Sequence, residues 1–130
     1  MNLKFETINF EIIENIAIIH LNRPNSYNSL NAKMAKELLE ISYECDTIKK
    51  IRAIILSGEG DKAFCAGGDL KSFHETGNVA KHLKMVTHDL HGAITRFSRM
   101  NSPWIVAVNG VAAGAGLSFD GFADLAIAKS

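Results

Sequence analysis

Two clusters of small residues have the composition and placement expected of a site for a developing negative charge. The first, Phe-Cys-Ala-Gly-Gly-Asp-Leu-Lys, occupies residues 64–71, and the second, Asn-Gly-Val-Ala-Ala-Gly-Ala-Gly-Leu, occupies residues 109–117. Each lies where a predicted strand gives way to a predicted helix. Small residues let another group approach the backbone, and a helix start leaves N–H groups without partners. Two such N–H groups directed at one point would form an oxyanion hole, which stabilises a carbonyl oxygen that becomes negative during reaction.

The elements expected around these clusters alternate between strands and helices. Residues 5–21 are rich in Ile, Phe and Thr with a polar interruption at 14–15, which predicts a β-hairpin. Asn31 is a suitable cap for a helix over residues 32–45, in which Met34, Leu38, Ile41 and Cys45 recur at helical spacing. A second helix is expected over residues 80–100, with Leu83, Val86, Leu90, Ile94 and Phe97 on one face and Gly92 as an unfavourable interior residue. Short apolar runs predict buried strands at 53–56, 104–108 and 125–128, and a further helix is expected near 114–122. This alternation indicates an α/β fold.

Bulk properties exclude several classes of protein. The 130 residues carry 14 Lys plus Arg and 14 Asp plus Glu, so the net charge is zero, and no basic patch favours nucleic acid. The N-terminus has no signal-peptide core, and no apolar run is long enough for a membrane span. Two cysteines, Cys45 and Cys65, lack metal-ligand spacing and suit a reducing cytoplasm. We therefore expect one cytoplasmic domain with no nucleic-acid or membrane partner.

The two glycine clusters, in their order and separation, resemble the enoyl-CoA hydratase/isomerase (crotonase) superfamily. The resemblance extends over nearly the whole chain through residues 21–24 and 28–31 (Leu-Asn-Arg-Pro and Asn-Ser-Leu-Asn), 53–58, 103–110 and 123–128. It implies a crotonase-like superhelix of ββα units, of which residues 1–130 are the N-terminal part. Family members are much longer, so the C-terminal half and the helical trimerisation region would be absent. We expect this chain alone to be inactive, and the full-length protein to be a homotrimer or hexamer acting in fatty acid metabolism.

The resemblance assigns roles to residues of both clusters. It implies that the backbone N–H groups of Gly68 and Ala115 grip the thioester oxygen of an acyl-CoA while an enolate forms. The substrate-binding and CoA-binding set that it implies is Lys62, Ala66, Gly67, Gly68, Asp69, Leu70, Lys71, Gly114 and Ala115. Asp69 is expected to cap a helix, not to act as an acid. No cofactor or metal is expected, because coenzyme A is part of the substrate.

Alternatives remain open for several of these residues. The glycine clusters could be ordinary tight turns, and Lys62 and Lys71 could be solvated surface lysines instead of neighbours of the CoA phosphates. His82, His88 and His91 could form a metal-binding face, but no matched carboxylate or cysteine set supports one.

The catalytic carboxylates distinguish two classes of function. Family hydratases place a glutamate where this chain has Ser118, and a second one beyond Ser130. Because hydration needs two carboxylates to manage one water and one proton, Ser118 favours an isomerase, which needs a single acid, over a hydratase. Asp120 is another acid on the same helix, with a structural or a catalytic role. The alternative is a non-catalytic acyl-CoA-binding or assembly relative.

A last expectation concerns cover for the strands. If the chain ends at Ser130, the apolar faces of residues 104–108 and 125–128 should be uncovered, since buried strands need cover on both sides. We therefore expect either exposed apolar surface or association between copies.

Overall fold

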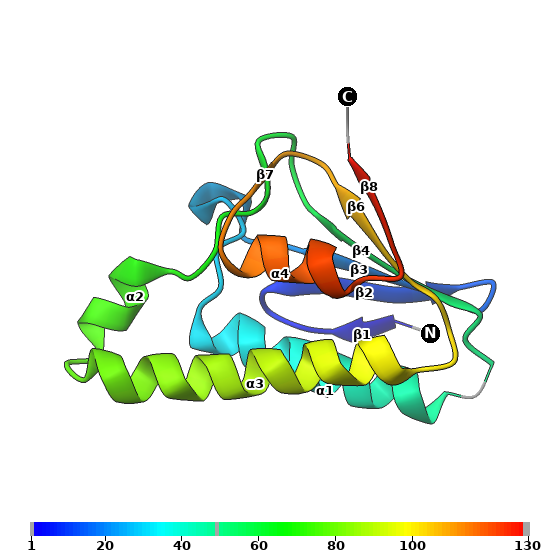
Figure 1. Ribbon diagram of the computed structural model, residues 1–130, viewed down its shortest axis with the longest axis horizontal. Helices are drawn as coiled ribbons and strands as arrows, with labels where there is room; N and C mark the ends of the chain where they lie inside the picture. The colour runs from blue at the N-terminus through cyan, green and yellow to red at the C-terminus, as the bar shows by residue number, and fades with distance from the viewer. Residues whose placement is uncertain (1, 49, 129–130) are drawn as a thin grey trace.

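A six-stranded mixed sheet forms the body of the computed structural model, which describes residues 2–48 and 50–128 (Figure 1). The strand order is β1-β2-β3-β4-β6-β8. The first three strands pair antiparallel, and each later strand pairs parallel with its neighbour. The strands are β1 (Asn2–Lys4), β2 (Ile8–Ile13), β3 (Ile16–Leu21), β4 (Ala53–Gly58), β6 (Trp104–Val108) and β8 (Leu125–Ala128).

The predicted hairpin is present as β2 and β3. Its turn residues Glu14 and Asn15 both have positive φ, 51° and 67°, as in the type I′ turns that match the twist of paired strands. The hairpin begins at Ile8 and not at residue 5, and β1 forms an additional strand that the sequence did not predict.

Two short strands form a second, parallel sheet that completes the ββα units. β5 (Ala63–Cys65) follows β4, and β7 (Val111–Ala112) follows β6. Helices α2 (Leu70–Glu75) and α3 (Val79–Arg99) follow β5, and α4 (Ala115–Phe122) follows β7. The order strand, short strand, helix therefore occurs twice, which confirms the expected ββα architecture.

Helices α1 (Ala32–Thr47) and α3 lie side by side against the sheet (Figure 1). The Asn31 side chain accepts a hydrogen bond from the Met34 N–H at 2.9 Å, so it caps α1 as predicted. Gly92 allows α3 to approach α1, because a methyl group there would lie 3.0 Å from Leu39 Cδ1. A short 3₁₀ helix, η1 (Pro24–Ser26), precedes α1. None of the helices among the described residues combines the length and apolarity needed to cross a bilayer.

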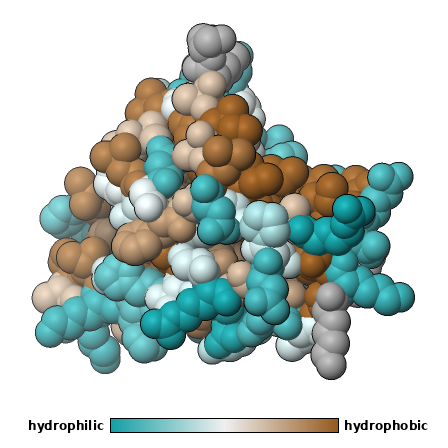
Figure 2. All heavy atoms as spheres, turned by 45° about the vertical axis from the view of Figure 1, so that its right-hand side comes forward, coloured by the Kyte–Doolittle hydropathy of each residue, from teal (hydrophilic) through white to brown (hydrophobic). Residues whose placement is uncertain are grey.

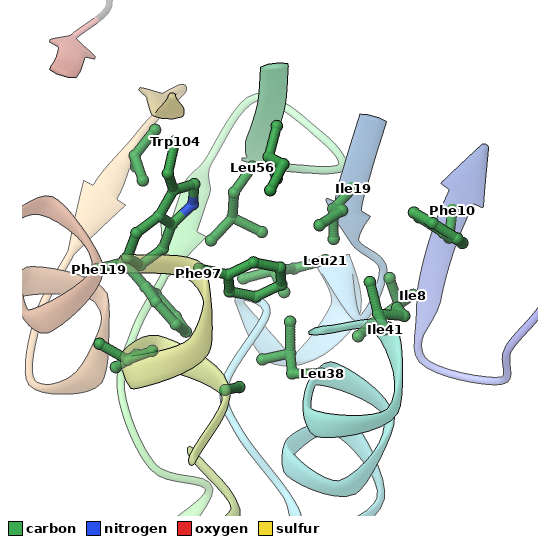
Figure 3. Packing of buried hydrophobic residues seen from close by; sticks show 14 of the residues in the cluster. Ile8, Phe10, Ile19, Leu21, Leu38, Ile41, Leu56, Phe97, Trp104 and Phe119 are labelled. Carbon is green, nitrogen blue, oxygen red and sulfur yellow. The ribbon is translucent and has the colours of Figure 1, made fainter. Parts of the chain in front are cut away.

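The core lies between the sheet and the helices, where buried side chains from both layers point toward one another (Figure 3). Trp104 packs against Phe97 and Phe119, with ring centroids 5.4 and 6.4 Å away. Trp104 and Val106 are fully buried, so the expectation that β6 is uncovered is wrong for this face. The reason is that α3 and α4 supply the aromatic cover from within the chain.

Strand β8, in contrast, is exposed along its whole length, as predicted. Leu125 and Ile127 are 53% and 54% exposed. Other exposed apolar side chains include Val111, Leu117 and Phe122. Figure 2 shows that apolar atoms gather over the upper part of the face drawn there. On α3, Leu83 is also exposed, which corrects the prediction that it shares the buried face of Val86 and Leu90.

Candidate active site

The two glycine clusters lie next to each other because the strands that precede them are paired. β5 and β7 are parallel, so their carboxyl ends meet at the same edge of the small sheet. The Ala113 N–H donates to the Cys65 carbonyl at 3.1 Å just beyond the paired residues. The loop of residues 66–69 and the loop of residues 113–114 therefore leave this edge together.

Glycine lets the two loops touch. Gly67 and Gly114 have φ of +102° and +52°, which disfavour any side chain. A methyl group at Gly114 would lie 3.4 Å from Gly67 Cα. One at Gly116, in the first turn of α4, would lie only 2.4 Å from the Cys65 carbonyl oxygen. The start of α4 is thus held against the end of β5 at a distance that only glycine permits.

In the first loop, hydrogen bonds hold the residues on either side of Gly67 and Gly68. Ala66 and Asp69 donate to the carbonyl oxygens of Tyr27 and Leu30, at 3.1 and 2.8 Å. Gly68 forms an isolated parallel bridge with Leu30, yet its own N–H has no acceptor among residues 2–48 and 50–128. Gly68 is also exposed. Its N–H is therefore available to a ligand.

The first turn of α4 shows the same pattern. The N–H groups of Gly116 and Leu117 donate to the carbonyls of Ala113 and Gly114, at 2.9 and 3.0 Å. The Ala115 N–H, at the first helical position, has no acceptor within the described part of the chain. The partial positive charge of the helix N-terminus adds to this donor. The structure thus leaves a free donor in each of two adjoining loops.

An ion pair anchors the first loop to the segment that follows β3. Arg23 Nη2 lies 2.9 Å from Asp69 Oδ2, and Arg23 Nη1 donates to the Ser29 carbonyl at 2.6 Å. The other carboxylate oxygen of Asp69 accepts from the Ser72 N–H at 3.2 Å, so Asp69 caps α2 as predicted. Burial alone would raise the Asp69 pKa, but the hydrogen bonds from Arg23 and Ser72 and the Arg23 charge hold it below its usual value.

Asn28 ties the same segment to the strand before the loop. It is fully buried and has a φ of 54°. Its side-chain oxygen accepts from the Arg23 N–H at 2.7 Å, and its amide donates to the carbonyls of Glu59 and Ala63 at 3.0 and 3.1 Å. Asn28 therefore holds the chain entering β5 in place.

Ser118, at the position of a family glutamate, and the acid Asp120 do not share a face of α4. Ser118 and Asp120 are two positions apart, which on an α-helix is a rotation of about 200°. Asp120 lies on the side of the buried Gly116 and Phe119, while Ser118 lies opposite. One carboxylate oxygen of Asp120 is buried without a partner among the described residues, and burial raises its pKa. Asp120 therefore does not replace a carboxylate at position 118.

The remaining predicted site residues lie around the loops. Lys62, Ala66, Leu70 and Lys71 are all exposed, and Leu70 is 70% exposed. Cys65 is buried, and burial raises the pKa of its thiol to about 11, so it is not a thiolate nucleophile at neutral pH. The contacts of Lys62, Ala66, Leu70 and Lys71 with coenzyme A stay a prediction.

Sequence reasoning missed the supports of the first loop. It expected a helix capped by Asp69 but gave that helix no bounds, and it did not foresee the buried Phe73 of α2, which lies so close to Gly68 that a methyl group on Gly68 would be 3.0 Å from the ring. It also gave no role to Arg23, 46 residues from its partner Asp69. The capping pattern of Asp69 followed by Ser72 was a usable signal for α2. No local pattern indicates the ion pair.

Comparisons with known proteins show which sequences and folds this chain resembles. The family profile described as enoyl-CoA hydratase/isomerase matches residues 11–130. Among curated relatives, (E)-benzylidenesuccinyl-CoA hydratase of Thauera aromatica is 33% identical over 95% of this chain and 47% of its own length. The 4-chlorobenzoyl coenzyme A dehalogenase-2 of an Arthrobacter species is 31% identical over 92% of this chain and 44% of its own length.

Solved structures show the same fold. The enoyl-CoA hydratase from Bacillus anthracis superposes with a TM-score of 0.86 at 30% identity, covering 95% of this chain and 47% of the hydratase. The chain thus spans about half the length of the relatives that it matches, which is consistent with an incomplete form of their fold.

Proposed function

The chain belongs to the enoyl-CoA hydratase/isomerase family, and we propose that the whole protein acts on an acyl-CoA thioester through an oxyanion-stabilised enolate. The observation that supports this proposal is the pair of unpartnered N–H groups at Gly68 and Ala115, at the adjoining ends of β5 and β7. The resemblance to the family implies a donor role for these same two positions. In this proposal the thioester oxygen lies between them.

The chemistry follows from where charge develops. When a base removes a proton from the carbon next to the thioester carbonyl, the electron pair moves onto the carbonyl oxygen. Fixed N–H donors stabilise that charge without reorganising, and one such donor is worth about 10²- to 10³-fold in rate. The α4 terminus lies at the Ala115 donor and contributes in the same direction.

We favour isomerisation over hydration because of Ser118. An isomerase moves one proton between two carbons and needs one acid–base group, whereas a hydratase also has to activate water. Ser118 provides no carboxylate, and Asp120 lies on the other side of α4. We place the acid outside residues 1–130, in the part of the fold that the longer relatives possess.

The remaining parts of the proposal concern the rest of the ligand and the assembly. We place Lys62 and Lys71, both exposed, near the phosphates of coenzyme A, where a lysine acts as a point charge. We also propose that the whole protein is a homotrimer or hexamer. A cytoplasmic location suits its free, buried thiols at Cys45 and Cys65.

Substitutions at Ser118 test the reaction class. We expect Ser118→Ala in the whole protein to keep isomerisation of a 3-enoyl-CoA within a few-fold of wild type, because in this proposal the hydroxyl takes no part in the proton transfer. Ser118→Glu should add measurable hydration of a 2-enoyl-CoA, followed as loss of the conjugated enoyl absorbance. Efficient hydration by the unmodified protein would contradict the isomerase assignment.

A non-catalytic acyl-CoA-binding role is the second candidate, and Ser118 is the observation that favours it. The two roles differ in proton exchange. An enzyme that forms the enolate should exchange the Cα protons of butyryl-CoA with deuterium from D₂O, detected by mass spectrometry, whereas a binding protein should bind the same thioester without exchange.

A further inference from the structure

We propose that Arg23 is a positioning residue, whose ion pair with Asp69 fixes the direction of the Gly68 N–H. This inference rests on the proposed function, because it concerns the donor that would hold the thioester oxygen. Arg23 does not itself need to touch the substrate. It acts through the backbone of the first glycine loop.

The guanidinium joins two segments that are far apart in the sequence. One nitrogen of Arg23 donates to the Ser29 carbonyl at 2.6 Å, and the other lies 2.9 Å from Asp69 Oδ2. The side chains of Arg23 and Asp69 are only 19% and 16% exposed, so solvent screens the pair little. The loop after β5 is therefore fixed to the segment after β3.

Backbone hydrogen bonds on either side of Gly68 set the direction of its N–H group. The Leu30 N–H donates to the Gly67 carbonyl at 2.7 Å, and the Asp69 N–H donates to the Leu30 carbonyl at 2.8 Å. In a parallel bridge of this kind, the residue between the two bonded neighbours turns its own N–H to the other side. The Gly68 N–H consequently points away from Leu30. A shift of Asp69 along Leu30 would rotate the peptide group that carries the Gly68 N–H.

Arginine is required at position 23 because its side chain makes two polar contacts with two different guanidinium nitrogens. Two nitrogens must reach a carbonyl and a carboxylate at once, which a lysine ammonium on its flexible stem reproduces poorly. The hydrogen bond that the Ser72 N–H donates to Asp69 holds α2 but not the Ser29 segment, so it cannot substitute for the bonds of Arg23. Gly68 has no side chain of its own to fix its orientation.

The test compares Arg23→Gln and Arg23→Lys in the whole protein with a matched control, Arg96→Gln. Arg96 forms a similar ion pair, 2.6 Å from Asp46, but it joins α3 to α1. Two quantities are measured: kcat and KM for the enoyl-CoA reaction, and the infrared stretch of the thioester carbonyl in bound butyryl-CoA labelled with ¹³C at that carbon. A carbonyl that accepts strong hydrogen bonds vibrates at a lower frequency.

We expect Arg23→Gln to lower kcat by about 10- to 100-fold with less than a threefold change in KM, because a donor displaced by a fraction of an ångström stabilises the transition state poorly. The carbonyl band should return toward its frequency in water. Arg23→Lys, which keeps the positive charge beside Asp69, should restore kcat and the carbonyl frequency only in part. Arg96→Gln should leave both unchanged.

Other outcomes overturn the inference in distinguishable ways. A wild-type kcat and carbonyl band in Arg23→Gln would show that the ion pair is only structural, as would an equal loss in Arg96→Gln. If the bound carbonyl shows no shift in the wild-type protein, the proposed function itself is contradicted. Hydrogen exchange of residues 64–75, which needs no ligand, then shows separately whether Arg23 holds the loop.

Discussion

The close approach of α4 to β5 can be tested by adding a single methyl group. A Cβ at Gly116 would lie 2.4 Å from the Cys65 carbonyl oxygen and 3.2 Å from Cys65 Cβ. That carbonyl already accepts the Ala113 N–H at 3.1 Å, so it cannot rotate away without losing a bond. In Gly116→Ala, the first turn of α4 therefore has to move.

The size of the movement follows from the distance. Ordinary contact begins near 3.4 Å, so a methyl group at 2.4 Å requires a shift of about 1 Å. Ala115 precedes Gly116 and would move with it. Because a misplacement of about 1 Å can cost about 10²-fold, we expect kcat to fall by about that factor. Overpacking of this kind should also lower the free energy of unfolding by about 1–3 kcal/mol.

The same substitution elsewhere on α4 provides the control. A methyl group at Gly121 would meet no atom of the described residues within 4 Å. Gly121→Ala should therefore keep wild-type kcat and should stabilise the helix by up to about 1 kcal/mol. The assay is enoyl-CoA turnover by the whole protein, with urea unfolding measured in parallel. Wild-type kcat in Gly116→Ala would refute the argument that this contact sets the position of the Ala115 donor.

Two further predictions concern the supports of the first loop. Asn28→Ala should lower the free energy of unfolding by about 4 kcal/mol, because it leaves the Arg23 N–H and the Glu59 carbonyl without partners, removes one of two donors to the Ala63 carbonyl and puts alanine at a left-handed φ. In the same urea titration, the exposed Asn25→Ala should cost less than about 0.5 kcal/mol. The second prediction concerns Asp69, whose pKa in the folded state is lower than its usual 3.8. The ionised carboxylate therefore stabilises the folded protein above about pH 4, and this stabilisation is lost as the pH falls through the folded pKa. The stability difference between wild type and Asp69→Asn should stay constant from about pH 7 to 5 and shrink below about pH 4; a constant difference down to about pH 2 would contradict it.

Local signals in the sequence were enough for most elements of the fold. The helix after Asn31 and the turn at residues 14–15 were predictable because a cap and a left-handed turn depend on neighbouring residues alone. The adjacency of the two glycine loops was predictable only through the family resemblance. Its physical cause, the parallel pairing of β5 with β7, involves two very short strands with no usable periodicity.

What could not be predicted depends on contacts between distant residues. The burial of Trp104 depends on rings from α3 and α4, and the role of Gly92 depends on a leucine of α1. The bond between Arg23 and Asp69 spans 46 residues. From a single sequence, Arg23 and Asp69 look like two ordinary surface charges, because the residues next to each of them do not show whether its side chain contacts water or a distant charged residue.

The supports of the site explain how the N–H groups of Gly68 and Ala115 stay free while hydrogen bonds fix the segments that flank them. An N–H group that could rotate would bond to its own loop or to solvent, and its use in catalysis would then require reorganisation. At Gly68 the flanking bonds to Leu30 and the Arg23 anchor remove that freedom, and at Ala115 the contact between Gly116 and Cys65 does so. Loss of any one support should therefore reduce kcat more than substrate affinity. This pattern distinguishes donors that act on the transition state from donors that only bind the substrate.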